Sequence, residues 1–211
     1  MPTDIIFWVL VLGFSVILHE VAHGYMANYL GDPTAKLQGR LTLNPISHID
    51  PLGTIILPLL LSLSGSPILI GYAKPVPYNP YNLRHKNGEA LVAFAGPGTN
   101  IIIALVFGLA LRFLGASIDP ALAQAFAIIV AINIFLAIFN LLPIPPLDGS
   151  KVLPVFLPYT LRRGYDSIRA NFERMGVFSG TLLILLIFYF LSPFFTRLVS
   201  YLFFTLTGFP L

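Results

Sequence analysis

Long segments without any charged side chain constrain this chain more than any other feature. Only 10% of its 211 residues are charged, compared with about 25% in soluble domains, and the mean hydropathy is +0.85. Each segment is long enough to cross a bilayer, which takes roughly 20 helical residues at 1.5 Å each. We therefore predict an all-α polytopic membrane protein in which residues 1–211 form a single membrane-embedded domain. The segments are Leu52–Ala73, Ala90–Leu111, Pro120–Leu147 and Met175–Thr196.

Another apolar stretch, near the N-terminus, carries three ionisable residues within five positions, His19, Glu20 and His23. Each ionisable group in such a segment costs on the order of 2.5–3.5 kcal/mol, so packing is a poor explanation for them. On a helix the two histidines lie one turn apart on the same face, where both imidazoles reach one cation. Glu20 is offset from them, close enough to take a proton from water without being a ligand. The pattern predicts one Zn²⁺ per chain, with Glu20 as the general base.

A catalytic zinc takes three protein ligands and keeps one position open. A third histidine six residues after His23 is absent, because that position is Tyr29. Asp148 is the best candidate, since it closes the longest uncharged segment. The three prolines in the stretch 140–149 exclude a regular helix there, and the glycine that follows Asp148 permits a tight turn. The carboxylate is therefore able to point sideways at a neighbouring helix.

These motifs together resemble the site-2 protease family of intramembrane zinc metalloproteases. The resemblance rests on His-Glu-x-x-His at 19–23, on Asn-x-x-Pro-x-x-x-x-Asp-Gly at 140–149, and on Gly-Pro-Gly-Thr-Asn at 96–100. It covers about residues 5–165. We expect a minimal member of the family, without PDZ or CBS domains.

The resemblance implies a role for each matching residue. His19, His23 and Asp148 would be the metal ligands, and Glu20 the general base and acid. Asn140 would be an auxiliary catalytic residue that positions the substrate or the oxyanion. From the residues alone, Asn140 is equally well explained as a contact between helices, as Asn100 and Asn133 are.

The basic residues lie in the gaps between apolar segments, as in cytoplasmic loops. With these loops inside, the first helix and Pro120–Leu147 both run inward, so that both metal-binding motifs lie at cytoplasmic ends. We expect a multi-pass protein of the plasma (inner) membrane with its active site toward the cytoplasm. The residues concerned are Lys36, Arg40, Lys74, Arg84, Lys86, Lys151, Arg162, Arg163, Arg169 and Arg174.

This topology requires Leu52–Ala73 to begin and end on the same side of the membrane. It is interrupted by Pro58, Gly65 and Pro67, so we expect a re-entrant loop or a short β-hairpin between the first two long helices. The family resemblance suggests a strand pair at Pro67–Tyr78, which we expect to bind the unwound substrate as an added strand. Four to six membrane segments result, because Leu198–Leu211 is too short to span alone and its placement stays open.

We therefore expect an intramembrane zinc metalloendopeptidase that hydrolyses a transmembrane protein or peptide substrate in the lipid bilayer. Nucleic acid is not an expected partner, because the formal net charge is only +3 and the basic residues form no patch with aromatics. The alternatives are a metal-binding membrane transporter and a catalytically silent scaffold. The glutamate between the histidines, the single Asp-Gly loop and the lack of repeats disfavour transport. The oligomeric state is not predicted.

His48 has several possible roles. It could be a fourth metal ligand, a gate or a group supporting a ligand, or a loop histidine hydrogen-bonded to a nearby acid such as Asp50.

Overall fold

The structure is a computed structural model that describes residues 2–56, 59–60, 63, 73–174 and 176–211. Every regular element within these residues is helical, which confirms the all-α prediction. Four of the helices are long and apolar enough to cross a membrane, so the chain is a multi-pass membrane protein. The candidate spans are Ile5–Tyr29, Gly88–Leu114, Pro120–Asn140 and Tyr189–Thr207.

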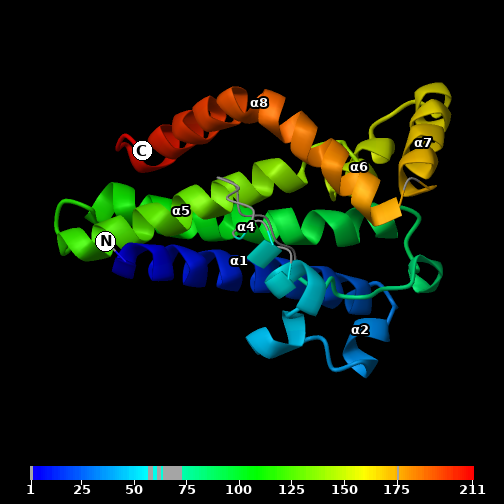
Figure 1. Cartoon of the computed structure of the whole chain (residues 1–211), viewed down its shortest axis with the longest axis horizontal. Coiled ribbons are helices and arrows are strands. Elements are labelled where there is room, and N and C mark those ends of the chain that lie inside the picture. Colours follow the sequence, from blue (N-terminus) through cyan, green and yellow to red (C-terminus); the bar gives the residue numbers. More distant parts are fainter. Residues whose placement is uncertain (1, 57–58, 61–62, 64–72, 175) are drawn as a thin grey trace.

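The four long helices are α1 (Pro2–Tyr29), α4 (Gly88–Leu114), α5 (Pro120–Asn140) and α8 (Gly176–Thr207). They run along the long axis of the molecule, and α4 packs against each of the other three (Figure 1). Successive helices alternate in direction, so the N- and C-termini lie at the same end of the bundle. The end of α1 and the end of α5 therefore meet at the opposite end.

The remaining elements are short, apart from α7, and α7 runs across the bundle axis at the end opposite the termini (Figure 1). In chain order they are α2 (Thr34–Leu37), η1 (Pro45–His48), η2 (Pro51–Ile56), η3 (Pro80–Asn82), α6 (Gly149–Val152), η4 (Leu153–Val155) and α7 (Tyr159–Arg174).

Local sequence explains where the long helices begin and end. Pro120 opens α5, and the Asp119 side chain caps it by accepting a hydrogen bond from the Ala121 N–H at 2.8 Å. The helix ends at Asn140, seven residues before the end of the uncharged segment, because prolines follow. Pro193 does not end α8, which continues to Thr207, so the stretch after Pro193 forms no separate span.

The predicted re-entrant segment lies mostly outside the described residues, as does the first half of the predicted strand pair, residues 67–72. Pro51–Ile56 forms a turn of π-helix, and residues 73–78 have no regular secondary structure. Both the re-entrant loop and the strand pair stay predictions.

The helices pack through small and branched side chains. In a bilayer, close packing replaces the hydrophobic effect as the main attraction between helices, so small residues are favoured where backbones approach. Gly108 of α4 is one such position, because a Cβ there would meet the Leu206 side chain of α8 at 2.5 Å. The buried cluster shared by α4, α5 and α8 contains Ala104, Leu111, Val130, Ala131, Ile134, Val199 and Phe203.

We predict that Gly108→Val destabilises the bundle by about 1–3 kcal/mol, because the added side chain overpacks the contact with Leu206. Gly13→Val is the matched control, since nothing lies within 4 Å of a Cβ added at Gly13. The measurement is the free energy of unfolding in mixed detergent micelles. Equal stability of the two variants would contradict this account of the α4–α8 contact.

Candidate metal centre

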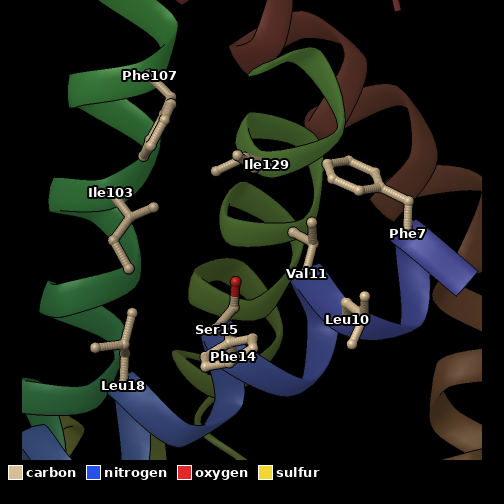
Figure 2. Close-up of a pocket in the computed structure, with 9 residues that line it drawn as sticks. All are labelled: Phe7, Leu10, Val11, Phe14, Ser15, Leu18, Ile103, Phe107 and Ile129. Carbon is tan, nitrogen blue, oxygen red and sulfur yellow. The ribbon is translucent and has the colours of Figure 1, made fainter. Parts of the chain in front are cut away.

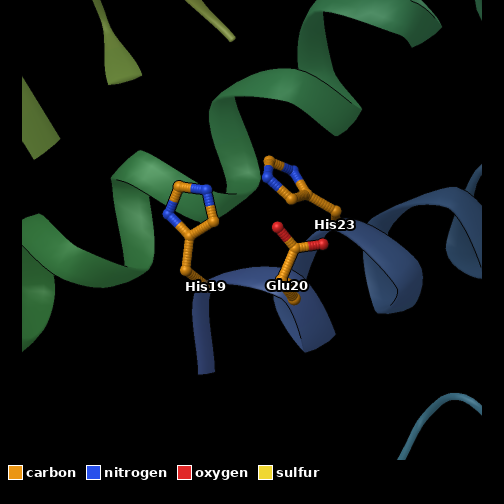
Figure 3. Close-up of side chains that lie close together, drawn as sticks. All are labelled: His19, Glu20 and His23. Carbon is orange, nitrogen blue, oxygen red and sulfur yellow. The ribbon is translucent and has the colours of Figure 1, made fainter. Parts of the chain in front are cut away.

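The imidazoles of His19 and His23 leave α1 on the side that faces α4 (Figure 3). His19 Nδ1 lies 2.6 Å from Asn100 Oδ1, and His23 Nδ1 lies 2.7 Å from the Val92 carbonyl oxygen. Both oxygens are acceptors, so each Nδ1 carries a hydrogen and donates it. Each neutral imidazole then presents the lone pair of Nε2, which is the form that binds a metal.

Asp148 brings the third donor atom to the same point. Its Oδ2 lies 3.2 Å from His19 Nε2 and 3.3 Å from His23 Nε2. Two ligands on a tetrahedral zinc, each about 2.0–2.1 Å from the metal, are separated by about 3.3 Å. Two nitrogens and one carboxylate oxygen at this spacing are a donor set that fits zinc. The structure thus brings together the three residues that the sequence predicts as ligands.

The Asp148 carboxyl is held in its ionised form. Burial raises its pKa, but the adjacent His19 and His23 side chains act in the opposite direction and outweigh burial. Its pKa therefore lies well below the usual value. An ionised carboxylate is the form that a metal requires.

Gly96 of α4 leaves the space that the two imidazoles occupy. A Cβ at this position would lie 2.6 Å from His19 Nε2, and closer still to His23 Nε2. Any larger residue would therefore push α4 away from α1 or displace the rings. This steric requirement accounts for the first glycine of the Gly-Pro-Gly-Thr-Asn element.

A series of hydrogen bonds between buried amides holds the His19 ring in place. Asn100, which accepts from His19, donates through Nδ2 to Asn133 Oδ1 of α5 at 2.8 Å. Asn133 in turn donates to Ser15 Oγ of α1 at 3.0 Å. Asn100 and Asn133 form contacts between helices, as predicted; the second role of Asn100, orienting His19, was not predicted. The signal available was an amide on an apolar helix next to a Gly-Pro element.

Glu20 lies beside the two imidazoles, and one ligand atom from each of the three residues falls within 4.8 Å of the others (Figure 3). Its Oε2 accepts a hydrogen bond from the Val76 N–H at 2.9 Å. No described residue bonds its second oxygen, Oε1. The backbone at Val76 thus fixes the Glu20 carboxylate while leaving one oxygen available.

Residues 73–79 are held against Glu20 by several anchors. The Arg40 guanidinium donates to the Lys74 carbonyl oxygen at 2.8 Å, and the Lys74 N–H donates to the His48 carbonyl oxygen at 2.9 Å. At the far end, the Asn79 N–H donates to Asp32 Oδ2 at 2.7 Å. The position of Val76 over Glu20 is therefore determined from both sides.

Asp32 is a fully buried carboxylate just after α1. Burial raises its pKa, but hydrogen bonds from Thr34, Asn82 and Asn79 outweigh burial, so its pKa lies below the usual value. Its ionised form ties the end of α1 to residues 79–82.

A cavity of about 470 Å³ opens beside these residues. His19, Glu20, His48 and Asn140 all line it, and it continues along α1 past Gly13 toward Val9. Residues from α1, from the connection that follows it and from α5 thus share one cavity.

His48 is 3% exposed, and its Nε2 lies 2.8 Å from the Thr42 carbonyl oxygen rather than against an acid. Its Nδ1 is buried without a hydrogen-bond partner among the described residues. His48 is not a member of the cluster formed by His19, Glu20 and His23.

A second cavity, of about 320 Å³, lies farther along the bundle between α1, α4 and α5 (Figure 2). Its lining is apolar except for Ser15, and it includes none of the predicted site residues. It carries no group suited to acid–base or metal chemistry. The nine lining residues are Phe7, Leu10, Val11, Phe14, Ser15, Leu18, Ile103, Phe107 and Ile129.

Comparison with known proteins identifies the family. Residues 112–187 match the model of peptidase family M50. The chain is 41% identical over 162 residues to "Putative zinc metalloprotease YwhC" of Bacillus subtilis, a match that covers 73% of this chain and 70% of that protein. It is 33% identical over 153 residues to "Putative zinc metalloprotease Rip2" of Mycolicibacterium smegmatis, covering 70% of this chain and 56% of that protein.

A more distant relative, "Zinc metalloprotease MJ0392" of Methanocaldococcus jannaschii, is 26% identical over 192 residues. That match covers 89% of this chain but 44% of the relative, so this chain spans only part of several relatives. No solved structure matches the sequence. The relatives imply Zn²⁺ as the cofactor, in agreement with the donor set described above. On the strength of the match to YwhC, which covers more than two thirds of both chains, this protein belongs to peptidase family M50, the site-2 protease family of zinc metalloproteases.

Proposed function

We propose that this protein is an intramembrane zinc metalloendopeptidase that hydrolyses peptide bonds of membrane-embedded substrates. The observation that carries the proposal is the convergence of His19 Nε2, His23 Nε2 and Asp148 Oδ2 on one point beside Glu20. The histidines come from a helix long enough to span the membrane, and Asp148 follows the end of another.

His19, His23 and Asp148 would hold the metal. A zinc ion in this donor set would lower the pKa of a water molecule to about 7 and polarise the scissile carbonyl group. The Nδ1 hydrogen bonds to Asn100 and Val92 hold each imidazole in the required tautomer and orientation.

Glu20 would be the general base and then the general acid. Its Oε2 is engaged by the Val76 N–H, so Oε1 is the atom that takes a proton from water and later delivers it to the leaving amine. The hydrogen bond from Val76 also keeps the carboxylate out of the set of ligands.

Asn140 would contact the substrate. It lines the same cavity as His19 and Glu20, and its Nδ2 donates one hydrogen to the Leu136 carbonyl oxygen at 2.9 Å. An amide nitrogen has two hydrogens, so the second is available to a substrate carbonyl oxygen or to the oxyanion that forms from it.

The substrate would reach the site from the bilayer. The cavity runs from Glu20 to Val9 along α1, a distance of about 16 Å at 1.5 Å per residue. Its walls there are apolar, which suits an apolar segment of another chain. Because the basic loops lie at the end where α1 and α5 finish, we assign that end to the cytoplasm.

Membership of a peptidase family favours hydrolysis over the alternative of metal transport. The presence of both a base and a complete donor set favours an active enzyme over a silent scaffold. Zinc content and the consequences of removing Glu20 test these choices.

For the metal, we predict that purified protein holds about one zinc per chain and that Asp148→Ala loses most of it, because one of three ligands is gone. Zinc is measured by elemental analysis of protein in detergent. His48→Ala is the matched control and should keep its zinc. If Asp148→Ala keeps its zinc while His48→Ala loses it, the third ligand is assigned wrongly.

Asn100 provides a test of the supporting hydrogen bonds. We predict that Asn100→Leu weakens zinc binding about 10–100-fold, because His19 loses the acceptor that holds its Nδ1 hydrogen. Thr99→Val is the control, since among the described residues the Thr99 hydroxyl bonds only the Ala95 carbonyl oxygen of its own helix. Competition with a zinc chelator measures both affinities, and unchanged affinity in Asn100→Leu would show that His19 needs no such support.

For catalysis, we predict that Glu20→Gln keeps its zinc and its fold but cleaves about 10²–10⁴-fold more slowly, because an amide cannot accept the proton. Expression in the native host should then make uncut membrane substrates accumulate, and comparison of the membrane proteomes identifies them. Asp119→Asn is a matched control at the start of α5, away from the site. Asparagine caps a helix as well as aspartate does. Near wild-type cleavage by Glu20→Gln would contradict the role of Glu20 as the general base.

A further inference from the structure

Helix α7 (Tyr159–Arg174) is strongly amphipathic although it is too polar and too short to be a membrane span. Leu161, Tyr165, Ile168 and Phe172 recur at spacings of four, three and four residues, so they lie on one face. The rest of the helix carries four arginines and two acids. An apolar stripe beside an arginine-rich face is typical of a helix that lies in a membrane interface.

The apolar stripe is not covered by the rest of the described chain at two of its positions. Leu161 and Ile168 are each 61% exposed. Large apolar side chains exposed together mark a surface that contacts something else. The helix also runs across the axis along which α1, α4 and α5 lie, so it is parallel to the plane of the bilayer those helices would span (Figure 1).

Cationic side chains on the rest of α7 indicate which partner the stripe would bind. Arg162 and Arg163 are exposed, and the ion pair of Arg162 with Asp166 is long, at 3.8 Å, and open to solvent. Such a pair contributes little, so the guanidinium groups are free to bind phosphate oxygens in its place. A helix with an apolar stripe and arginines on its remaining surface is complementary to the surface of an anionic bilayer.

The same helix is bonded to the loop that carries Asp148. The Tyr165 hydroxyl donates to the Pro143 carbonyl oxygen at 3.0 Å. Pro143 lies five residues before Asp148, in the loop that joins α5 to Asp148. Arg169 forms an ion pair with Glu89 in the first turn of α4, the helix whose Val92 and Asn100 orient the histidines.

We propose that α7 lies in the membrane interface, that it binds anionic lipid headgroups through Arg162 and Arg163, and that this seating steadies the Asp148 loop through Tyr165. Leu161 and Ile168 then enter the headgroup region of the bilayer. The seating stands independently of the protease function, whereas the effect on the Asp148 loop rests on the proposed metal ligands.

Fluorescence from single cysteines tests the seating, because the natural chain has none. Ile168→Cys places a label on the apolar stripe, and Ser167→Cys places one on the adjacent polar side as the matched control. In vesicles of phosphatidylcholine and phosphatidylglycerol, a quencher attached to lipid should quench the label at 168 much more strongly than the label at 167. Equal quenching at the two positions would overturn the seating.

The arginines are tested in the same vesicles. Replacing both Arg162 and Arg163 with glutamine should weaken the binding of α7 to the anionic surface about fivefold per arginine. Each arginine contributes about 1 kcal/mol of binding free energy there. In vesicles of phosphatidylcholine alone, the variant and the natural sequence should behave alike. A variant that keeps the full response to phosphatidylglycerol would show that lipid charge does not seat the helix.

Tyr165→Phe tests the connection to the Asp148 loop. This change removes the hydroxyl and keeps the ring, so quenching of the label at 168 should be unaltered. In the natural sequence, phosphatidylglycerol should slow the loss of zinc to a chelator, and in Tyr165→Phe it should not. If lipid charge has no effect on zinc loss in the natural sequence, or the same effect in both, the connection is wrong. Because no proteolysis is measured, this result is independent of whether the protein is a protease.

Discussion

Two imidazoles in a membrane-spanning helix impose the constraint on which the rest of this structure depends. Each ring has two nitrogens that must be satisfied, since an unpaired polar group in the bilayer interior is costly. One nitrogen of each points toward Asp148, so the other must find an acceptor on a neighbouring helix. Those acceptors lie on α4, and they require α4 to approach α1 so closely that only glycine fits at position 96. The amide chain to α5 then extends the same requirement to a third helix.

The alternating direction of the long helices allows a carboxylate to reach the two histidines. Because α1 and α5 end at the same end of the bundle, a short loop after α5 suffices to bring Asp148 to the histidines. Prolines stop α5 before this loop, and the hydrogen bond from Tyr165 to Pro143 secures it from outside. The donor set is therefore built from one helix and one short loop that is anchored from outside.

The base is positioned by a different part of the molecule. Glu20 lies on the same helix as the histidines, but the Val76 N–H holds its carboxylate, and the residues around Val76 are tied down by Arg40 and Asp32. Donor atoms and base thus depend on separate supports, α4 for the former and residues 73–79 for the latter.

The sequence by itself determined the parts that depend on local chemistry. Uncharged segments predicted the long helices, because a bilayer sets helix length; the spacing of His19 and His23 predicted a shared face, because a helix turns every 3.6 residues. Prolines before Asp148 predicted a turn for the same local reason. Only the tertiary structure decided which groups support them: the acceptors for the two imidazoles, the Val76 N–H on Glu20 and the Thr42 carbonyl oxygen on His48. These contacts join residues far apart in the chain or involve backbone atoms, which every residue has, so no pattern of side chains marks them in advance.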